Sequence, residues 1–386
     1  MRTLTLAAAA LALTACGEPP AKDAPSAAGT PSTAATPATS VPPTPAQAVV
    51  SETREFRDWR AVCDNGNACM AWTGVSGGWV RVTMDAGPDA VPTVTAGSWT
   101  LGEPGQALAD AGLRTDGRDH ALKAGPKDAA NAAAGAERAR GIVAGLAAAR
   151  SLEITAGDKA EPLPVSGASA ALLWIDERQG RLDTTTALIR RGPRPASAVP
   201  AAPALPRVIP ATAVDQTGFR GGENPQGGDV EARLVVPAAI EALPDVRQCR
   251  ADTNEYLRKA VLAVRLGPDA ELWGIPCDSG AYNATYILYV TDRGGARPRP
   301  AELPLREPRA EGDIGGGEDG PWLVNPVFDP KGQTLTVFPR GRGIGDCGTI
   351  TTWTWTGRAF ALSEERFMGD CWGISSDLWP TLWRTR

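Results

Sequence analysis

Residues 56–72 have the sequence FRDWRAVCDNGNACMAW, which predicts how the fold begins. Phe56 to Cys63 alternates in the manner of a strand, and residues 64–67 (Asp-Asn-Gly-Asn) are typical of a tight turn. Cys69 to Trp72 then predicts a second strand, so that a cysteine stands on each side of the turn. We therefore expect order to begin at Phe56, with a β-hairpin that is crosslinked across its turn.

The chain after this hairpin predicts more strands and one helix. Residues 79–84 have the pattern of a strand, and residues 170–175 and 184–189 predict a strand pair. Residues 128–150 are rich in alanine and space their larger apolar residues along one face, which predicts a helix. We expect residues 51–190 to form a sandwich-like N-terminal β domain with one helix.

Six prolines lie between residues 191 and 212, and we predict a Pro-rich linker there. Residues 213–386 predict a C-terminal antiparallel β domain that is rich in tryptophan and stapled by disulfides. It has a short helix at 254–259 and strands at 261–266, 271–277, 286–291, 334–338, 350–355 and 360–364. The fold class is thus mainly β with minor α, in two antiparallel β domains.

The N-terminus has the pattern of an export signal. Arg2 precedes a short apolar run that ends in Leu13-Thr14-Ala15-Cys16. A Leu, two small residues and a Cys at this distance resemble a bacterial lipobox, which implies that residues 1–15 are a lipoprotein signal peptide. Cys16 would then become the new N-terminus and carry fatty acids such as palmitate. The alternative is an ordinary signal peptide that contains a cysteine.

Residues 16–50 consist mainly of Pro, Ala and Thr with other small residues, and the stretch has eight prolines and no aromatic residue. Such a stretch buries too little apolar surface to fold, so we expect a disordered tether. Gly17 is not the Asp that retains many Gram-negative lipoproteins in the inner membrane. That resemblance implies a lipid anchor in the outer membrane, with the protein facing the periplasm of the bacterial cell envelope.

Charge excludes some partners. The chain has 39 Lys and Arg against 44 Asp and Glu, so removal of Arg2 leaves 38 against 44 and a net charge of −6. Nucleic-acid binding needs a basic face, and the sequence has no cluster that would supply one. After the signal, no run approaches the length of about 18 apolar residues that spans a membrane.

Six cysteines follow Cys16, an even number that predicts three disulfides in an oxidising compartment. Six cysteines allow 15 pairings, and sequence proximity favours Cys63–Cys69, Cys249–Cys277 and Cys347–Cys371. Zinc is a weak alternative because the chain has no CxxC and its single histidine, His120, is far from every cysteine. We expect no metal and no cofactor.

Three groups of segments resemble a known family. They are Phe56-Arg57-Asp58-Trp59 with Cys63-Asp64-Asn65 and Cys69, Leu173-Trp174-Ile175-Asp176 with Gln179-Gly180-Arg181, and residues 341–348 with Trp355-Thr356-Gly357. They resemble bacterial domain-of-unknown-function family 1176, which is described as having six characteristic cysteines. The resemblance covers roughly residues 52–386 and implies an exported, disulfide-bonded protein without an assigned catalytic site. The first domain is also similar to the invasion-associated locus B family.

Two glycine motifs and one histidine are candidates for chemistry. Residues 74–78 match GxSxG, but a strand follows them, so a hairpin loop is favoured over a nucleophile elbow. Residues 343–348 match GxGxxG, but a strand follows there too, which favours a tight turn over a dinucleotide site. His120 lies in a charged, turn-prone stretch, and we expect a solvated side chain.

Twelve tryptophans stand against six phenylalanines. Trp353 and Trp355 are two residues apart and share one face of the predicted strand, so they are candidate ligand-binding aromatics for sugar rings. The alternative is that they form a Trp-rich β core.

Taken together, the sequence predicts a non-catalytic envelope lipoprotein that acts as a binding or structural module. Its partners would be the membrane, through the N-terminal lipid, and an envelope protein or glycan. The alternative function is a carboxylate-dependent hydrolase acting on cell-wall or surface glycan. That alternative requires two acidic side chains facing each other across a cleft, about 5–10 Å apart. A host-interaction role is implied only by the similarity to the invasion-associated family.

Overall fold

The computed structural model describes residues 49–102, 108–125, 131–219, 234–251, 253–306 and 323–386. Its strands form four antiparallel sheets, so the fold is mainly β, as the sequence predicts. In these described ranges, no helix combines the length and the apolar character that a membrane span needs.

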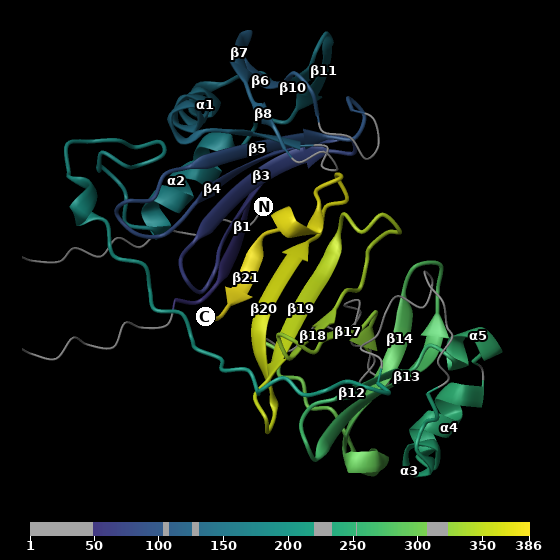
Figure 1. Cartoon of the computed structure of the whole chain (residues 1–386). Helices are drawn as coiled ribbons and strands as arrows, with labels where there is room; N and C mark the ends of the chain where they lie inside the picture. Colours follow the sequence, from purple (N-terminus) through teal and green to yellow (C-terminus); the bar gives the residue numbers. More distant parts are fainter. Residues whose placement is uncertain (1–48, 103–107, 126–130, 220–233, 252, 307–322) are drawn as a thin grey trace, which may run out of the picture. The chain divides into compact units, whose positions relative to one another are not determined.

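The first sheet has seven strands in the order β1-β2-β3-β4-β5-β9-β8 (Figure 1). These are β1 (Glu52–Phe56), β2 (Trp59–Cys63), β3 (Cys69–Val75), β4 (Gly78–Met84), β5 (Thr93–Ser98), β9 (Asn131–Ala134) and β8 (Lys123–Ala124). The expected start at Phe56 is wrong: β1 begins earlier, and the chain turns at Arg57 and Asp58 before β2. The predicted hairpin β2–β3 is confirmed, with Cys63 directly opposite Cys69.

One face of this sheet is covered by two helices and a second sheet. The helices are α1 (Ala136–Ala148) and α2 (Ala168–Arg178), and the second sheet has the order β11-β10-β6-β7. Its strands are β10 (Leu152–Ala156), β11 (Lys159–Leu163), β6 (Ala111–Thr115) and β7 (Arg118–Ala121). Helices α1 and α2 and strands β6, β10 and β11 contribute to one hydrophobic core with the sheet. The region therefore has two helices instead of the predicted one, and residues 131–134 of the predicted helix are strand β9.

The predicted strand pair at 170–175 and 184–189 is wrong. Residues 170–175 lie in α2, whose apolar side chains pack on β2 and β3. Residues 184–189 form no strand because the buried Asp176 carboxylate accepts the backbone N–H groups of Leu188, Ile189 and Arg190. These three hydrogen bonds supply locally what a strand partner would supply.

The opposite face of the seven-stranded sheet is also buried. In β2 to β4, every second residue points away from the helices, and these residues include Val62, Met70, Trp72 and Trp79. They form a separate core with residues near the end of the chain, namely Cys347, Met368, Ile374 and Trp379. Successive side chains of these strands thus point into two different apolar cores. They do not alternate between a core and solvent.

The segment 191–212 contains the short 3₁₀ helix η1 (Ala196–Ala198) and one isolated β-bridge, between Arg194 and Thr184. Two of its backbone N–H groups donate to late parts of the chain, Val208 to Arg386 O and Ala211 to Trp355 O. The prolines therefore belong to an extended segment that is hydrogen-bonded to residues far along the chain.

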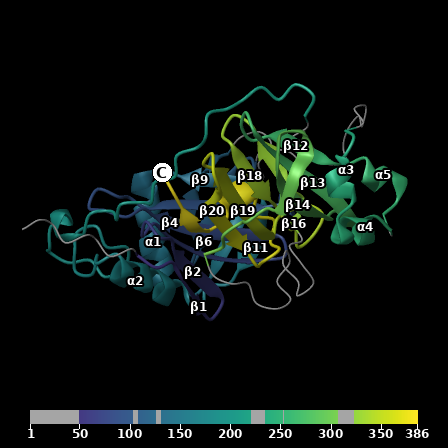
Figure 2. The same ribbon diagram turned by 90° about the horizontal axis from the view of Figure 1, so that it is seen from below.

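The third sheet has the order β12-β13-β14-β15, with β16 also paired to β14. Its strands are β12 (Leu262–Arg265), β13 (Ala270–Ser279), β14 (Ala284–Asp292), β15 (Ala296–Pro300) and β16 (Leu323–Val324). Helices α3 (Ala238–Glu241), α4 (Pro244–Ala251) and α5 (Glu255–Arg258) lie together beside β13 and β14, as Figures 1 and 2 show, and η2 (Arg293–Gly295) follows β14. The predicted helix at 254–259 is confirmed by α5, which Asn254 caps.

The fourth sheet runs β17-β18-β19-β20-β21 and contains the C-terminus. Its strands are β17 (Val327–Asp329), β18 (Thr334–Val337), β19 (Gly348–Trp355), β20 (Phe360–Met368) and β21 (Thr381–Arg384), with η3 (Ser376–Leu378) before β21. All six strands predicted after residue 260 are present. The three disulfides are Cys63–Cys69, Cys249–Cys277 and Cys347–Cys371, the pairs that sequence proximity favours.

By its contacts, Ala46–Arg386 is one compact unit. The first two sheets lie before residue 190 and the last two after residue 213. A division at the Pro-rich segment stays a prediction. The core shared by the first and fourth sheets shows that residues on both sides of that segment pack together.

Candidate functional site

A polar hollow of about 400 Å³ lies beside the two Gly-Asp-Cys turns at 345–347 and 369–371, and we call it the Trp99 hollow. Its lining comes from the ends of β4 and β5, from β9, and from the loops before β19 and after β20. The lining residues are Trp79, Trp99, Asn131, Phe338, Arg340, Ile344, Gly345, Asp346, Gly373, Ser375 and Ser376. A volume of this size suits a small ligand.

The Gly-Asp-Cys turns are held together beside the hollow. The Cys347–Cys371 disulfide joins them, and the buried Asp346 carboxylate accepts the Gly373 backbone N–H at 2.7 Å. The Arg342 guanidinium holds the same carboxylate through two hydrogen bonds, with Arg342 Nε 2.6 Å from Asp346 Oδ1. These hydrogen bonds raise the pKa of Arg342. Asp346 is therefore fully engaged as a structural anion.

Trp99 is the aromatic side chain of the hollow that is open to solvent, at 41% exposure. The Arg342 guanidinium lies 5.1 Å from the centre of its ring, a cation–π contact. Gly373 lies against the indole at a φ of 85°, and a Cβ at that position would stand 3.2 Å from Trp99 Cδ1. The indole is thus held between Arg342 and Gly373, while part of it stays accessible.

Arg340 is a second cation in the lining, and its surroundings differ from those of Arg342. Its guanidinium lies 5.2 Å from the centre of the Phe338 ring. Its Nε is buried and has no hydrogen-bond partner among the described residues, and no ion pair joins it to any of them. Among the described lining residues, the acidic one is Asp346, which is paired with Arg342, and no ion pair joins Arg340 to a described residue.

A smaller hollow of about 230 Å³ is lined by three aspartates and three arginines: Asp64, Asp85, Asp377, Arg81, Arg366 and Arg384. Asp64 forms an ion pair with Arg384 at 2.5 Å and accepts the backbone N–H groups of Gly66 and Ala68. Burial nevertheless raises the pKa of Asp64, against the opposing effect of Arg384. Burial also lowers the pKa of Arg81 to about 10, with Asp377 acting in the opposite direction.

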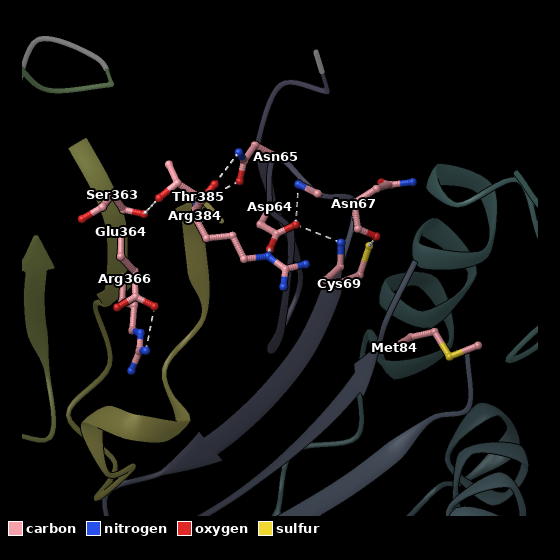
Figure 3. A network of polar contacts seen from close by, with 12 residues as sticks. Asp64, Asn65, Asn67, Cys69, Met84, Ser363, Glu364, Arg366, Arg384 and Thr385 are labelled. Atoms are coloured by element: carbon pink, nitrogen blue, oxygen red, sulfur yellow. Dashed lines mark hydrogen bonds and ion pairs between the residues drawn. The ribbon is translucent and has the colours of Figure 1, made fainter. Parts of the chain in front are cut away.

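The contacts around this smaller hollow tie the C-terminal strand to the β2–β3 hairpin (Figure 3). Asn65 Nδ2 donates to Arg384 O, and Arg384 N donates to Asn65 Oδ1, both at 2.9 Å. Thr385 N and Thr385 Oγ1 both donate to Ser363 O. Asp64 and Asn65 therefore hold β21 in place, a structural role that accounts for the Asp64–Arg384 pair in the lining.

Trp353 and Trp355 are not placed to bind sugar rings. Trp353 is 1% exposed and Trp355 is 4% exposed, and both belong to the core of the last two sheets. The Trp353 indole N–H donates to Pro304 O, which satisfies its polar atom inside the core. The pair shares one face of β19 as predicted, but that face is the inside. An edge of Trp355 lines a hollow of about 290 Å³ with Phe360.

The other candidates have structural surroundings. GxSxG is the β3–β4 hairpin loop, and GxGxxG is a turn that leads directly into β19, as predicted. His120 is buried in β7, so the expected solvated side chain is wrong. Its Nε2 lies 3.0 Å from Thr115 Oγ1, and burial, with Arg118, lowers its pKa.

The remaining predictions concern lipid and metal. Cys16 and the signal and tether up to residue 48 lie outside the described residues. Within the described residues, no group of three or more His, Cys, Asp or Glu side chains is arranged to hold a metal ion. The six described cysteines are all in disulfides.

Residue-by-residue reasoning did not single out Trp99 and Arg340. Trp99 follows β5 in irregular chain, and Arg340 follows β18, more than 200 residues away. The sequence gives a weak indication that Trp99 is exposed. Trp99 lies directly after a stretch with a strand pattern, so it has no place in an alternating pattern that would bury it. Its partners become visible only in the folded chain.

Comparison with known proteins identifies relatives. Residues 53–386 match the family described as "Protein of unknown function (DUF1176)". The chain is also similar to the uncharacterized protein YpfG of Escherichia coli strain K12. The two are 30% identical over 343 residues, which cover 86% of this chain and 93% of that protein. No solved structure matches.

Proposed function

Because this chain belongs to the DUF1176 family, whose description assigns no activity, we propose a function from the Trp99 hollow and the N-terminal signal. The protein is a non-catalytic, periplasm-facing envelope lipoprotein that binds a polar ligand in the Trp99 hollow. The observation that carries this proposal is a half-open indole in a polar hollow whose lining carboxylate, Asp346, is already engaged.

Support for the envelope location comes from two parts of the chain. Leu13-Thr14-Ala15-Cys16 has the lipobox pattern, and the Pro-rich stretch after it is a suitable tether. The three disulfides use all six later cysteines, as expected of an oxidising compartment. Lipid on Cys16, with buried acyl chains at about 0.8 kcal/mol per CH₂, would anchor the protein to the outer membrane.

Support for binding rather than catalysis comes from the chemistry of the lining. A general base needs a free acceptor within reach of substrate. Asp346 accepts hydrogen bonds from Arg342 and Gly373, and the described lining residues include no histidine or cysteine. Aromatic, amide, hydroxyl and guanidinium groups remain, which suits recognition.

The test uses the full chain purified from envelopes in detergent. Tryptophan fluorescence is titrated with a soluble digest of envelope glycan, and we expect saturable binding. Trp99→Ala should abolish the signal change and the binding measured by calorimetry. Tyr256→Ala, which removes a more exposed aromatic from α5, should leave binding intact. Binding that survives Trp99→Ala contradicts the assignment of the hollow.

The anchor needs its own measurement. Metabolic labelling with palmitate should mark the wild-type chain and not Cys16→Ser, and intact mass should place the mature N-terminus at Cys16. An unlabelled chain with its initiator methionine contradicts the lipoprotein proposal. The similarity of residues 51–190 to the invasion-associated locus B family stays a prediction.

The alternative function is a carboxylate-dependent hydrolase of cell-wall or surface glycan. One observation favours it, since Asp64, Asp85 and Asp377 line one hollow. Asp64 is engaged by Arg384, so Asp85 and Asp377 are the carboxylates to test. Release of reducing ends from envelope glycan, lost in Asp85→Asn or Asp377→Asn, would support hydrolysis. No release by the wild type contradicts it.

A further inference from the structure

Among the described lining residues of the Trp99 hollow, Arg340 is the arginine that no carboxylate neutralises. Arg342 and Asp346 form a closed ion pair, whereas no ion pair joins Arg340 to a described residue. A guanidinium in a partly enclosed site binds carboxylates through two parallel hydrogen bonds, a geometry that a point charge does not offer. The hollow therefore favours a ligand with an anionic group.

The other side of the lining favours a ligand with a flat apolar face. Trp99 is partly exposed, and the buried Trp79 and the partly buried Phe338 add aromatic surface to the lining. Aromatic side chains combine a large apolar contact area with fixed geometry. The ring C–H face of a sugar is a surface of this kind.

Hydroxyl recognition is supplied by short polar side chains around the rim. Asn131, Ser375 and Ser376 line the hollow, so amide and hydroxyl groups share the lining with the indole and the guanidinium. Ser375 Oγ can donate to Asp377 and still accept a hydrogen bond. The volume of about 400 Å³ accommodates one or two sugar rings.

We propose that the Trp99 hollow binds an acidic saccharide, with the sugar ring against Trp99 and its carboxylate paired with Arg340. This inference rests on the proposed function and specifies the ligand class of the same site. It distinguishes Arg340, which contacts the ligand, from Arg342, which positions Trp99 and Asp346.

Calorimetry on the full chain tests the inference with two matched probes. A hyaluronan tetrasaccharide carries glucuronate carboxylates, and chitotetraose is neutral. We expect the acidic probe to bind about tenfold more tightly, the effect of one charge-assisted contact. Raising the salt concentration should weaken the acidic probe alone.

Variants locate each contribution. Arg340→Gln should bring the two affinities within about twofold of each other, and Arg340→Lys should keep part of the difference. Trp99→Ala should abolish binding of both probes. Arg358→Gln, an exposed arginine in the β19–β20 turn, is the matched control and should change neither affinity. Far-UV circular dichroism and the melting temperature check that each variant is folded.

The failures are distinguishable. If the two probes bind equally and Arg340→Gln changes neither, the acidic-saccharide inference is overturned while binding in the hollow stands. If inorganic phosphate binds at Arg340 and no saccharide competes with it, the ligand class is wrong. If neither saccharide binds the wild type, this inference fails, and the glycan-digest titration decides the proposed function separately.

Discussion

Two groups of tryptophan side chains differ in what covers them. Trp353 and Trp355 lie on the inner face of β19, against side chains from both late sheets. Trp99 lies beyond the end of β5 and is covered only in part, by Arg342 and Gly373. In this protein, the two tryptophans within strand β19 therefore form part of the hydrophobic core. The aromatic at a strand end is free to meet a ligand.

The largest expected difference is in stability. Trp353→Ala should lower the free energy of unfolding by about 3–5 kcal/mol, because it removes a fully buried indole. Trp99→Ala should cost about 1 kcal/mol or less, since its side chain is half-exposed. Urea unfolding measures both. An equal cost at the two positions would break the comparison.

The disulfides offer a matched pair at nearly equal ring size. Cys347→Ser/Cys371→Ser and Cys249→Ser/Cys277→Ser should each cost about 3.5 kcal/mol at most by loop-closure entropy. Saccharide affinity should fall only in the first variant, because only that disulfide joins the two turns beside the hollow. Loss of affinity in both would mean that binding reports global stability.

Two asparagines sharpen the same distinction. Asn65→Ala should cost about 1–3 kcal/mol, because it removes both hydrogen bonds to the backbone of Arg384. Asn131→Ala should change stability by less and weaken saccharide binding instead. Chemical unfolding and calorimetry on both variants measure the two effects. If Asn131→Ala lowered stability more and Asn65→Ala weakened saccharide binding, the roles proposed for the two residues would be contradicted.

The smallest effect concerns pH. Burial lowers the pKa of His120, so between that lowered value and about 6.5 the unfolded chain binds more protons than the folded one. The free energy of unfolding should therefore decrease as the pH falls below about 6.5, and His120→Gln should remove this slope. Saccharide affinity should not follow it, because His120 lies outside the hollow. An unchanged slope in His120→Gln would show that other groups cause it.

Local pattern predicted the strands and disulfides well for a physical reason. Residues 56–72 combine alternation, a turn sequence and two cysteines, and the late strands are separated by clear turns. Residues 170–175 were predicted wrongly because a short apolar run fits a buried strand and a buried helix alike. The packing of this run on β2 and β3 as helix α2 is a tertiary contact that the sequence pattern does not show.

The residues of the Trp99 hollow could not be predicted from local sequence patterns. Trp353 and Trp355 attract attention as neighbours in sequence, yet burial depends on which sheet covers β19. Trp99 meets its partners Arg342 and Gly373 only through the folding of segments more than 240 residues apart. Whether an arginine is paired is likewise invisible in sequence, since Arg340 and Arg342 are separated by a single residue and have different surroundings.

Indole N–H resonances of the ¹⁵N-labelled full chain, assigned with Trp99→Phe and Trp353→Phe, give the most direct test. Addition of the hyaluronan tetrasaccharide should shift the Trp99 resonance in a saturable way and leave the Trp353 resonance in place. A Trp99 resonance that does not move at saturating ligand, or a shift at Trp353 instead, would contradict the assignment of the hollow as the binding site.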